Sequence, residues 1–150
     1  MDPDSTVMLS DSLLPGRVAH GEAHAYDLYW AETEVRRPDG TLLFADVLRL
    51  HPGAGDDPKS IGLLGPYDVV ATLYIVTRKL DPTALVSLMR SALAACPAVL
   101  AGATELPHGC GTATRLLGNS SAAVQAALWS VWNAARLELL GAPAPNLRKG

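Results

Sequence analysis

The stretch Tyr67-Asp68-Val69-Val70-Ala71-Thr72-Leu73-Tyr74-Ile75-Val76-Thr77 decides how the rest of the chain is arranged. It is a nearly continuous apolar run rich in β-branched residues, without the regular polar alternation of a strand that faces water. Such a run is typical of a central strand that is covered on both faces. We therefore predict that other elements of the chain pack against both sides of residues 67–77.

Two helices and two short strands are predicted after this run. Asp81 and Pro82 open a helix as cap and first residue, and Pro97 stops it. Its apolar stripe has helical spacing: Leu85, Leu88, Met89, Ala92 and Cys96. Strands at Ala101–Leu106 and Thr112–Leu117 follow, joined by a turn at Pro107-His108-Gly109. The last helix starts at Asn119-Ser120-Ser121 and runs to about Leu140, before Gly141 and Pro143.

A hairpin is predicted before the central run. Side chains alternate from Ala23 to Val35, and Pro38-Asp39-Gly40 supplies a tight turn into Thr41–Leu50. The second strand places five residues on one face: Leu42, Phe44, Asp46, Leu48 and Leu50. Residues 4–14 predict an edge strand, and His51–Pro66 a loop rich in glycine and proline.

These elements predict an α+β fold, mainly β-strands with two C-terminal helices, in a single domain of residues 1–150. Residues 1–66 would form the hairpin scaffold and loop, and residues 67–150 a β-α-β-β-α segment. That segment is most of a ferredoxin-like unit. The length of 150 residues suffices for one domain with its own core.

Composition excludes several classes of protein. The net charge is −3 with dispersed Lys and Arg, so the basic stripe that binds nucleic acid is missing. No apolar run approaches the roughly 18 residues of a spanning helix. The acidic start, Met1-Asp2-Pro3-Asp4, does not resemble a signal peptide, which predicts a cytoplasmic protein with Cys96 and Cys110 as free thiols.

No motif of catalysis stands out, so we predict that the chain is not an enzyme. The sequence has no Gly-x-Ser-x-Gly elbow, no His-Glu-x-x-His and no phosphate-binding glycine loop. His108-Gly109-Cys110 places a thiol beside an imidazole, which is compatible with a metal or thiol site. Its position between two predicted strands favours a simple turn.

The last helix carries apolar residues on two faces. Its docking face contains Val124, Leu128, Val131, Trp132, Ala135 and Leu139, and Trp129, Leu137 and Leu140 lie on the far side among Gln125, Asn133 and Arg136. A helix that is apolar on two faces is buried all round or binds another protein. Trp129 would therefore face a partner, or fold beneath the C-terminal tail or another part of the protein.

Asp46 is a lone carboxylate among apolar neighbours. Such a group needs solvent, a paired charge or a bound cation. One interpretation pairs Asp46 with Arg17 or Arg49, and lets Glu22 accept backbone hydrogen bonds at the entry of the first hairpin strand. The other assigns these carboxylates to a cation.

Several motifs together resemble the urease accessory protein family UreD, also called UreH. They are the opening Leu14-Pro15-Gly16-Arg17-Val18-Ala19-His20-Gly21-Glu22, the hairpin turn Arg37-Pro38-Asp39-Gly40, the lone Asp46, and the ending from Gly141 to Lys149. The resemblance implies the C-terminal part of a longer β-rich protein, in a natural short form or a truncated product.

The resemblance also implies a function. It implies a maturation factor that bridges UreF and UreG to apo-urease and assists nickel insertion, with nickel in transit and no tightly bound cofactor. Carboxylates that would line a water-filled nickel passage are Glu22, Asp46 and Asp11. Residues that would bind the partner UreF are Trp129, Trp132, Asn133, Arg136, Leu137 and Leu140.

An alternative comes from the predicted fold alone. A ferredoxin-like unit could serve as a small-ligand-sensing or dimerisation module with no role in urease maturation. Binding to UreF would separate the two interpretations, because a sensing module would not bind it.

Overall fold

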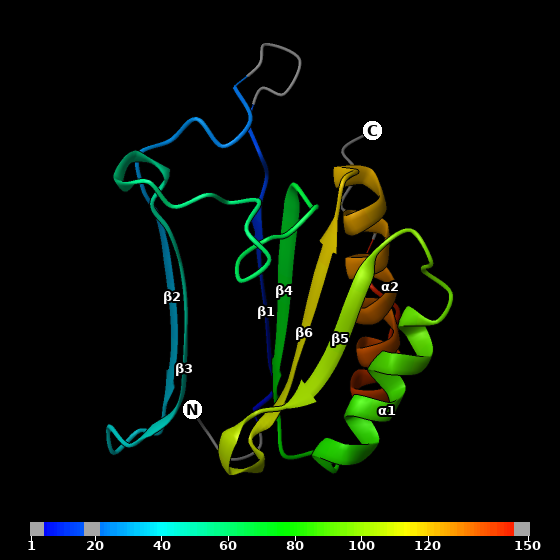
Figure 1. Cartoon of the computed structure of the whole chain (residues 1–150). Coiled ribbons are helices and arrows are strands. Elements are labelled where there is room, and N and C mark those ends of the chain that lie inside the picture. Colours follow the sequence, from blue (N-terminus) through cyan, green and yellow to red (C-terminus); the bar gives the residue numbers. More distant parts are fainter. Residues whose placement is uncertain (1–4, 17–21, 146–150) are drawn as a thin grey trace.

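The computed structural model describes residues 5–16 and 22–145. Figure 1 shows three layers: a two-stranded hairpin, a four-stranded sheet and a layer of two helices. The predicted α+β class is confirmed. The elements in chain order are β1 Val7–Leu13, β2 Tyr29–Arg36, β3 Leu42–Leu50, the 3-10 turn η2 Pro52–Ala54, β4 Val69–Val76, α1 Pro82–Leu93, β5 Leu100–Glu105, the 3-10 turn η3 Pro107–Gly109, β6 Gly111–Gly118 and α2 Ser121–Leu140.

The four-stranded sheet has the order β1-β4-β6-β5, and every neighbouring pair is antiparallel. Strands β4 and β5 therefore run parallel, with β6 between them and α1 as their connection. This is the split β-α-β arrangement of ferredoxin-like folds. The predicted edge strand is confirmed as β1, which pairs with β4, so residues before the hairpin complete the sheet of the C-terminal segment.

Strand β4 is buried on both faces, as predicted. All eight of its residues are buried. Successive side chains alternate across a strand, so Leu73 and Ile75 pack with the helices, whereas Tyr74 and Val76 pack with the hairpin residues Leu43 and Phe44. The core of the protein thus lies on both sides of this one strand.

The hairpin is confirmed, but β2 begins at Tyr29 rather than at Ala23. Residues 22–28 turn instead: the His24 amide donates to the Pro15 carbonyl at 2.7 Å, and the Gly53 amide donates to the Asp27 carbonyl at 3.1 Å. His24 also has a left-handed backbone, with φ of 54°. These backbone bonds take the segment out of the sheet, so Glu22 does not stand at the entry of a strand, as the sequence analysis expected.

The inner face of β3 is as predicted at Phe44, Asp46, Leu48 and Leu50. A register shift at Val35/Arg36 changes its start, so that Leu43 is buried and Leu42 is exposed. An irregularity of this kind re-aims the neighbouring side chains. The turn itself contains Gly40 with φ of 86°, a conformation that favours glycine.

Both helices begin as predicted. The Asp81 carboxylate accepts the Ala84 amide at 3.2 Å, and the Ser120 hydroxyl accepts the Ala123 amide at 3.3 Å. Helix α1 ends at Leu93, so the prediction that it extends to Cys96 was wrong. The Cys96 amide instead donates to the Leu93 carbonyl at 2.8 Å and forms a turn. Pro97 disfavours helical geometry at Cys96, the residue before it.

Helix α2 covers the sheet with the predicted face. Val124, Val131 and Ala135 are buried, and Leu128, Trp132 and Leu139 pack against the core from the margins. Gly141 ends the helix with φ of 63°, and its amide donates to the Leu137 carbonyl. Among the described residues, neither helix has the length and apolar character needed to cross a membrane.

Candidate functional site

A row of polar side chains lies between the hairpin and the four-stranded sheet. Thr72 and Tyr74 interrupt the apolar face that β4 turns toward the hairpin, and β6 places Arg115 directly opposite Thr72. Strand β1 places Asp11 opposite Thr72 on the other side. We call the following set the inter-sheet row: Asp11, Tyr29, Asp46, Thr72, Tyr74 and Arg115.

Asp46 is the centre of this row. The Tyr74 hydroxyl and the Arg115 Nη2 both donate to its Oδ2 atom, and Arg115 Nε donates to the Thr72 hydroxyl at 3.3 Å. The Asp46 side chain is 30% exposed and that of Arg115 is 48% exposed. The lone carboxylate is therefore paired across the two sheets, at a position that water reaches.

The predicted alternative partners of Asp46 were Arg17 and Arg49. Arg49 stands on the opposite face of β3, where it contacts His51 and Asp56, so that part of the prediction was wrong. Arg17 lies outside the described residues. The actual partner, Arg115, comes from a strand much later in the chain.

A second carboxylate of the row is bound in a similar way. The Tyr29 hydroxyl donates to Asp11 Oδ2 at 2.9 Å, and the Ser12 amide donates to Asp11 Oδ1 at 2.9 Å. Burial and this hydrogen bond raise the pKa of Tyr29 to about 12. Burial and the Asp46 carboxylate likewise raise the pKa of Tyr74 to about 12, against the opposing effect of Arg115. Both phenols thus remain proton donors at neutral pH.

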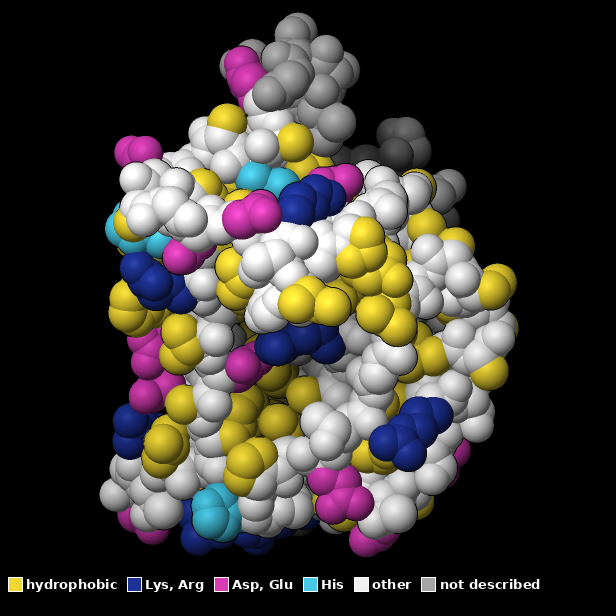
Figure 2. All heavy atoms as spheres, in the orientation of Figure 1, with side chains coloured by type: hydrophobic (Ala, Val, Ile, Leu, Met, Phe, Trp, Pro, Cys, Tyr) yellow, Lys and Arg dark blue, Asp and Glu magenta, His cyan; other side chains and the backbone are white. Residues whose placement is uncertain are grey.

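The row borders a cleft of about 400 Å³ between β3 and the strands β5 and β6. Asp46, Tyr74 and Arg115 line it together with Phe44 and Glu105, which extend it toward β5. Figure 2 shows a hollow with a hydrophobic floor, and a basic and an acidic side chain at its upper edge. The cleft can therefore admit solvent and small ions to the paired carboxylate.

The three predicted metal ligands are not gathered in one place. Asp11 and Asp46 both face the space between the sheets, whereas Glu22 is exposed in the loop before β2. Within residues 5–16 and 22–145, no group of three or more His, Cys, Asp or Glu side chains could hold a metal ion. Each carboxylate of the row is instead held by a phenol, a guanidinium or a backbone amide.

The predicted partner-binding residues on α2 divide into two groups. Trp129, Leu137 and Leu140 are 47%, 49% and 45% exposed. Asn133 and Arg136 bind the chain that follows the helix, since the Ala144 amide donates to Asn133 Oδ1 at 2.8 Å and Arg136 Nε donates to the Pro143 carbonyl at 3.2 Å.

The tryptophans of α2 differ in their surroundings. Trp132 packs against the core, with the Arg136 guanidinium 5.6 Å from its ring centre. Trp129 borders a groove of about 290 Å³ between α2 and β1. The described part of the tail binds Asn133 and Arg136 and leaves Trp129 uncovered, so an apolar surface persists on this helix.

Cys110 lacks the lowered pKa of an activated thiol. It is buried, and burial raises the pKa of its thiol, whereas a nucleophilic cysteine needs a lowered pKa. His108 is exposed in the turn with φ of 58°. The turn interpretation of His108-Gly109-Cys110 therefore describes this segment.

Sequence reasoning missed the partners that hold the carboxylates. Tyr74 and Thr72 were visible as polar residues in a buried run, but pattern alone did not identify them as hydrogen-bond donor and acceptor. Arg115 was visible as a charge within the strand Thr112–Leu117. A charge on a strand next to a central buried strand needs a partner, and that signal could have identified it.

The fold and the row together describe a layered α+β protein whose ionisable groups between the two sheets are bound to one another. The sequence model of the UreD urease accessory protein family matches residues 1–150, and the chain belongs to this family.

Relatives support the same assignment. The chain is 41% identical to "Urease accessory protein UreD 2" of Streptomyces griseus subsp. griseus, over 98% of the chain and 50% of the relative. It is 40% identical to "Urease accessory protein UreD" of Haloarcula marismortui, over 98% and 48%. It is 31% identical to "Urease accessory protein UreD 2" of Brucella suis biovar 1, over 96% and 48%. The chain thus spans about half the length of the relatives it matches.

Proposed function

We propose that this protein acts in urease maturation, as an adaptor that bridges UreF and UreG to apo-urease and assists the insertion of nickel. Membership of the UreD family over residues 1–150 is the observation that carries this proposal. Its relatives bear the name urease accessory protein. The protein would work in the cytoplasm, would perform no bond chemistry of its own, and would hold nickel only as cargo.

The inter-sheet row supports a role in guiding a cation. Carboxylates bind Ni²⁺ reversibly, whereas thiolates retain it more strongly. In the proposed mechanism Asp46 exchanges Arg115 for the arriving ion, and Asp11 and Glu22 serve at other points of the passage. The partial exposure of Asp46 and Arg115 supports such an exchange, because neither side chain is fully buried away from water.

The exposed face of α2 supports a protein partner. Aromatic and arginine side chains are enriched at interface centres. In the proposed complex Trp129, Leu137 and Leu140 contact UreF. Trp132, Asn133 and Arg136 shape that surface by holding the helix and the following chain in place.

The proposal is tested in a urease-producing host that carries this gene. The gene is deleted, and the chain is returned as wild type, Asp46→Asn or Asp39→Asn. Asp39 is a matched control because it is an exposed aspartate in the hairpin turn. We expect urease activity and urease-bound nickel to be lost on deletion, restored by wild type and Asp39→Asn, and reduced at least tenfold with Asp46→Asn. Normal urease maturation in the deletion strain would contradict the proposal.

The split β-α-β order of β4, β5 and β6 favours a second candidate, a small-ligand-sensing or dimerisation module. Such a module would not co-purify with UreF. Co-purification of the full chain with UreF, measured beside urease activity, therefore separates the two candidates.

A further inference from the structure

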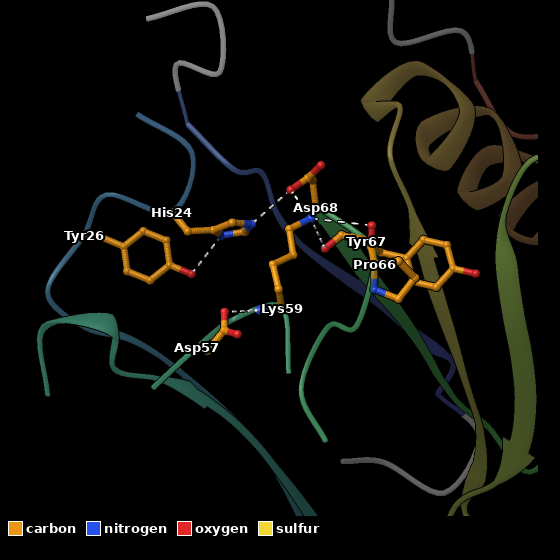
Figure 3. Close-up of polar contacts among 7 residues, drawn as sticks. All are labelled: His24, Tyr26, Asp57, Lys59, Pro66, Tyr67 and Asp68. Carbon is orange, nitrogen blue, oxygen red and sulfur yellow. Dashed lines mark hydrogen bonds and ion pairs between the residues drawn. The ribbon is translucent and has the colours of Figure 1, made fainter. Parts of the chain in front are cut away.

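Lys59 places its ammonium group among three oxygens of consecutive residues at the start of β4. Its Nζ atom lies 2.5 Å from Asp68 Oδ1, 3.1 Å from the Tyr67 carbonyl oxygen and 3.5 Å from the Pro66 carbonyl oxygen. Figure 3 shows these oxygens converging on the one ammonium. The segment 66–68 therefore forms a partial oxygen shell around a positive charge.

A buried imidazole stands beside this shell. The His24 side chain is only 6% exposed, its Nδ1 atom lies 3.2 Å from the Tyr26 hydroxyl, and its Nε2 atom lies 3.6 Å from the same Asp68 Oδ1 (Figure 3). Nε2 is buried without a hydrogen-bond partner. Leaving a buried polar atom unsatisfied costs about 1–3 kcal/mol. A ligand that binds Nε2 would remove this cost.

The local backbone holds the imidazole in this position at a further cost. His24 has φ of 54°, which is uncommon for a residue other than glycine. Its amide is fixed to the Pro15 carbonyl. Residues held in rare conformations cluster at ligand sites, and here the strain accompanies a nitrogen aimed at a carboxylate.

We propose that His24 and Asp68 form a binding site for a divalent transition-metal ion, with the carbonyl oxygens of Pro66 and Tyr67 and with water completing the ligands. Lys59 acts as a tethered cation that occupies this site and leaves when the metal ion enters. A nitrogen and an oxygen that bind one ion at about 2.1 Å each, at a right angle, lie about 3 Å apart. The present 3.6 Å between Nε2 and Oδ1 needs only a small contraction.

Lys59 is suited to this exchange. Its side chain is 43% exposed, so the ammonium can move into water without unfolding the protein. Its amide is held by Asp57 Oδ1 at 2.9 Å, which anchors the backbone while the side chain moves. The metal ion would replace the lost positive charge beside Asp68.

The ligand set indicates which ions fit. One imidazole nitrogen with oxygens suits Ni²⁺, Co²⁺ or Zn²⁺ better than Mg²⁺, which prefers oxygen and retains its waters. The choice of Ni²⁺ as first probe rests on the proposed function, whereas the site itself rests on His24, Lys59 and Asp68.

The test is titration of the purified full chain, freed of any affinity tag, with NiCl₂ in a calorimeter. We expect one tightly bound ion per chain in the wild type. His24→Gln and Asp68→Asn should each weaken binding at least tenfold. Lys59→Met should tighten binding at least tenfold, because the competing ammonium is gone. Lys79→Met is the matched control: it removes the same charge away from this site and should leave the affinity unchanged.

Loss of a ligand should weaken nickel binding, whereas loss of the Lys59 ammonium should strengthen it. Lys59→Met binding no more tightly than Lys79→Met would overturn the proposal, and so would unchanged affinity in a folded Asp68→Asn. Thermal unfolding without metal identifies any variant that has lost its fold, and Lys59→Met and Asp68→Asn remain decisive if His24→Gln does not fold. X-ray absorption of the nickel complex should show one imidazole ligand, retained in His51→Gln; its loss there would contradict the assignment. A hundredfold excess of Mg²⁺ should not displace Ni²⁺.

Failure of this site is distinguishable from failure of the proposed function. Urease activation in cells that express Lys59→Met and His24→Gln is measured separately from metal binding in solution. Normal activation without metal binding at His24 would overturn the site alone. If the purified chain binds metal as expected but urease matures normally in cells from which the gene is deleted, the proposed function is overturned. The metal site is then unaffected.

Discussion

Arg115 on β6 and Asp46 on β3 are 69 residues apart in sequence and form an ion pair that links the two sheets. Tyr74 donates to the same carboxylate oxygen from β4. One carboxylate therefore connects three strands. The hairpin is held to the larger sheet by this polar contact as well as by the apolar cluster of Leu43, Phe44 and Val76.

The link between Asp46 and Arg115 should be measurable in a double-mutant cycle. We expect a coupling free energy of about 1 kcal/mol between Asp46→Asn and Arg115→Met in urea unfolding, since the pair is partly exposed and belongs to a network. The control is the exposed pair of Glu34 and Arg36 within β2, which joins no separate elements and should couple by only a few tenths of a kcal/mol. Equal coupling in the two pairs would contradict a specific role for Asp46 in joining the sheets.

Two tyrosines should make the fold sensitive to alkali. The pKa values of Tyr29 and Tyr74 are raised to about 12 in the folded state, against 10.0 for a free tyrosine. The folded state keeps these protons where the unfolded chain loses them. The stabilisation that these groups contribute is therefore fully present below about pH 10, and the free energy of unfolding falls as the pH rises from about 10 to about 12.

The alkaline effect is checked by urea unfolding at a series of pH values, with absorbance at tyrosinate wavelengths. Tyr74→Phe retains the ring stacked on Phe44 at 5.6 Å and removes one late-titrating phenol, so its stability should fall less steeply above pH 10. A slope identical to that of the wild type would show that Tyr74 titrates normally.

Gly111 should tolerate no side chain. A Cβ atom there would lie 1.9 Å from the Ile75 carbonyl oxygen, and its φ is 146°. We expect Gly111→Ala to lower the free energy of unfolding by about 3 kcal/mol or more, because the added carbon clashes with the backbone of the neighbouring strand β4, with which β6 pairs. Gly102→Ala on β5 is the control, with no atom within 4 Å of the added carbon, and thermal unfolding of both variants provides the comparison.

Trp129 should be required for binding a partner and not for folding. We expect Trp129→Asp to reduce co-purification with UreF at least tenfold while the thermal midpoint stays close to that of the wild type, since the side chain is half exposed. Trp30→Asp is the matched control, because Trp30 is 58% exposed on the outer face of the hairpin. Equal binding by both variants would remove α2 from the proposed interface.

The long apolar patterns could be interpreted correctly from sequence. β4 is continuous and buried on both faces, and α2 has caps at Ser120 and Gly141, so local signals and tertiary burial agree there. They disagree at residues 23–28, where alternation predicts a strand but backbone bonds to Pro15 and Gly53 form turns. Local alternation carries no information about such distant partners.

The candidate site was predictable only in part. The isolation of Asp46 identified it as a residue that needs a partner, but its distance from Arg115 in sequence concealed which partner it has. His24 was expected on a strand, Lys59 lay in a predicted loop, and Asp68 lay at the start of the predicted central strand, where no binding role was assigned to it. These three residues come together because the loop 51–66 leads back to β4. The spacing of residues along the chain does not reveal the course of that loop.

The position of β1 constrains how the protein is made. A ribosome synthesises β1 before β4, yet β4, with which β1 pairs in the described sheet, emerges only after the whole hairpin and the following loop. Until then the segment has no template, and β4 in turn lacks cover on one side until α2 is complete. During synthesis the β2–β3 hairpin can therefore form early, whereas β1 can pair only after β4 is made, and β4 is fully buried only after α2 is made.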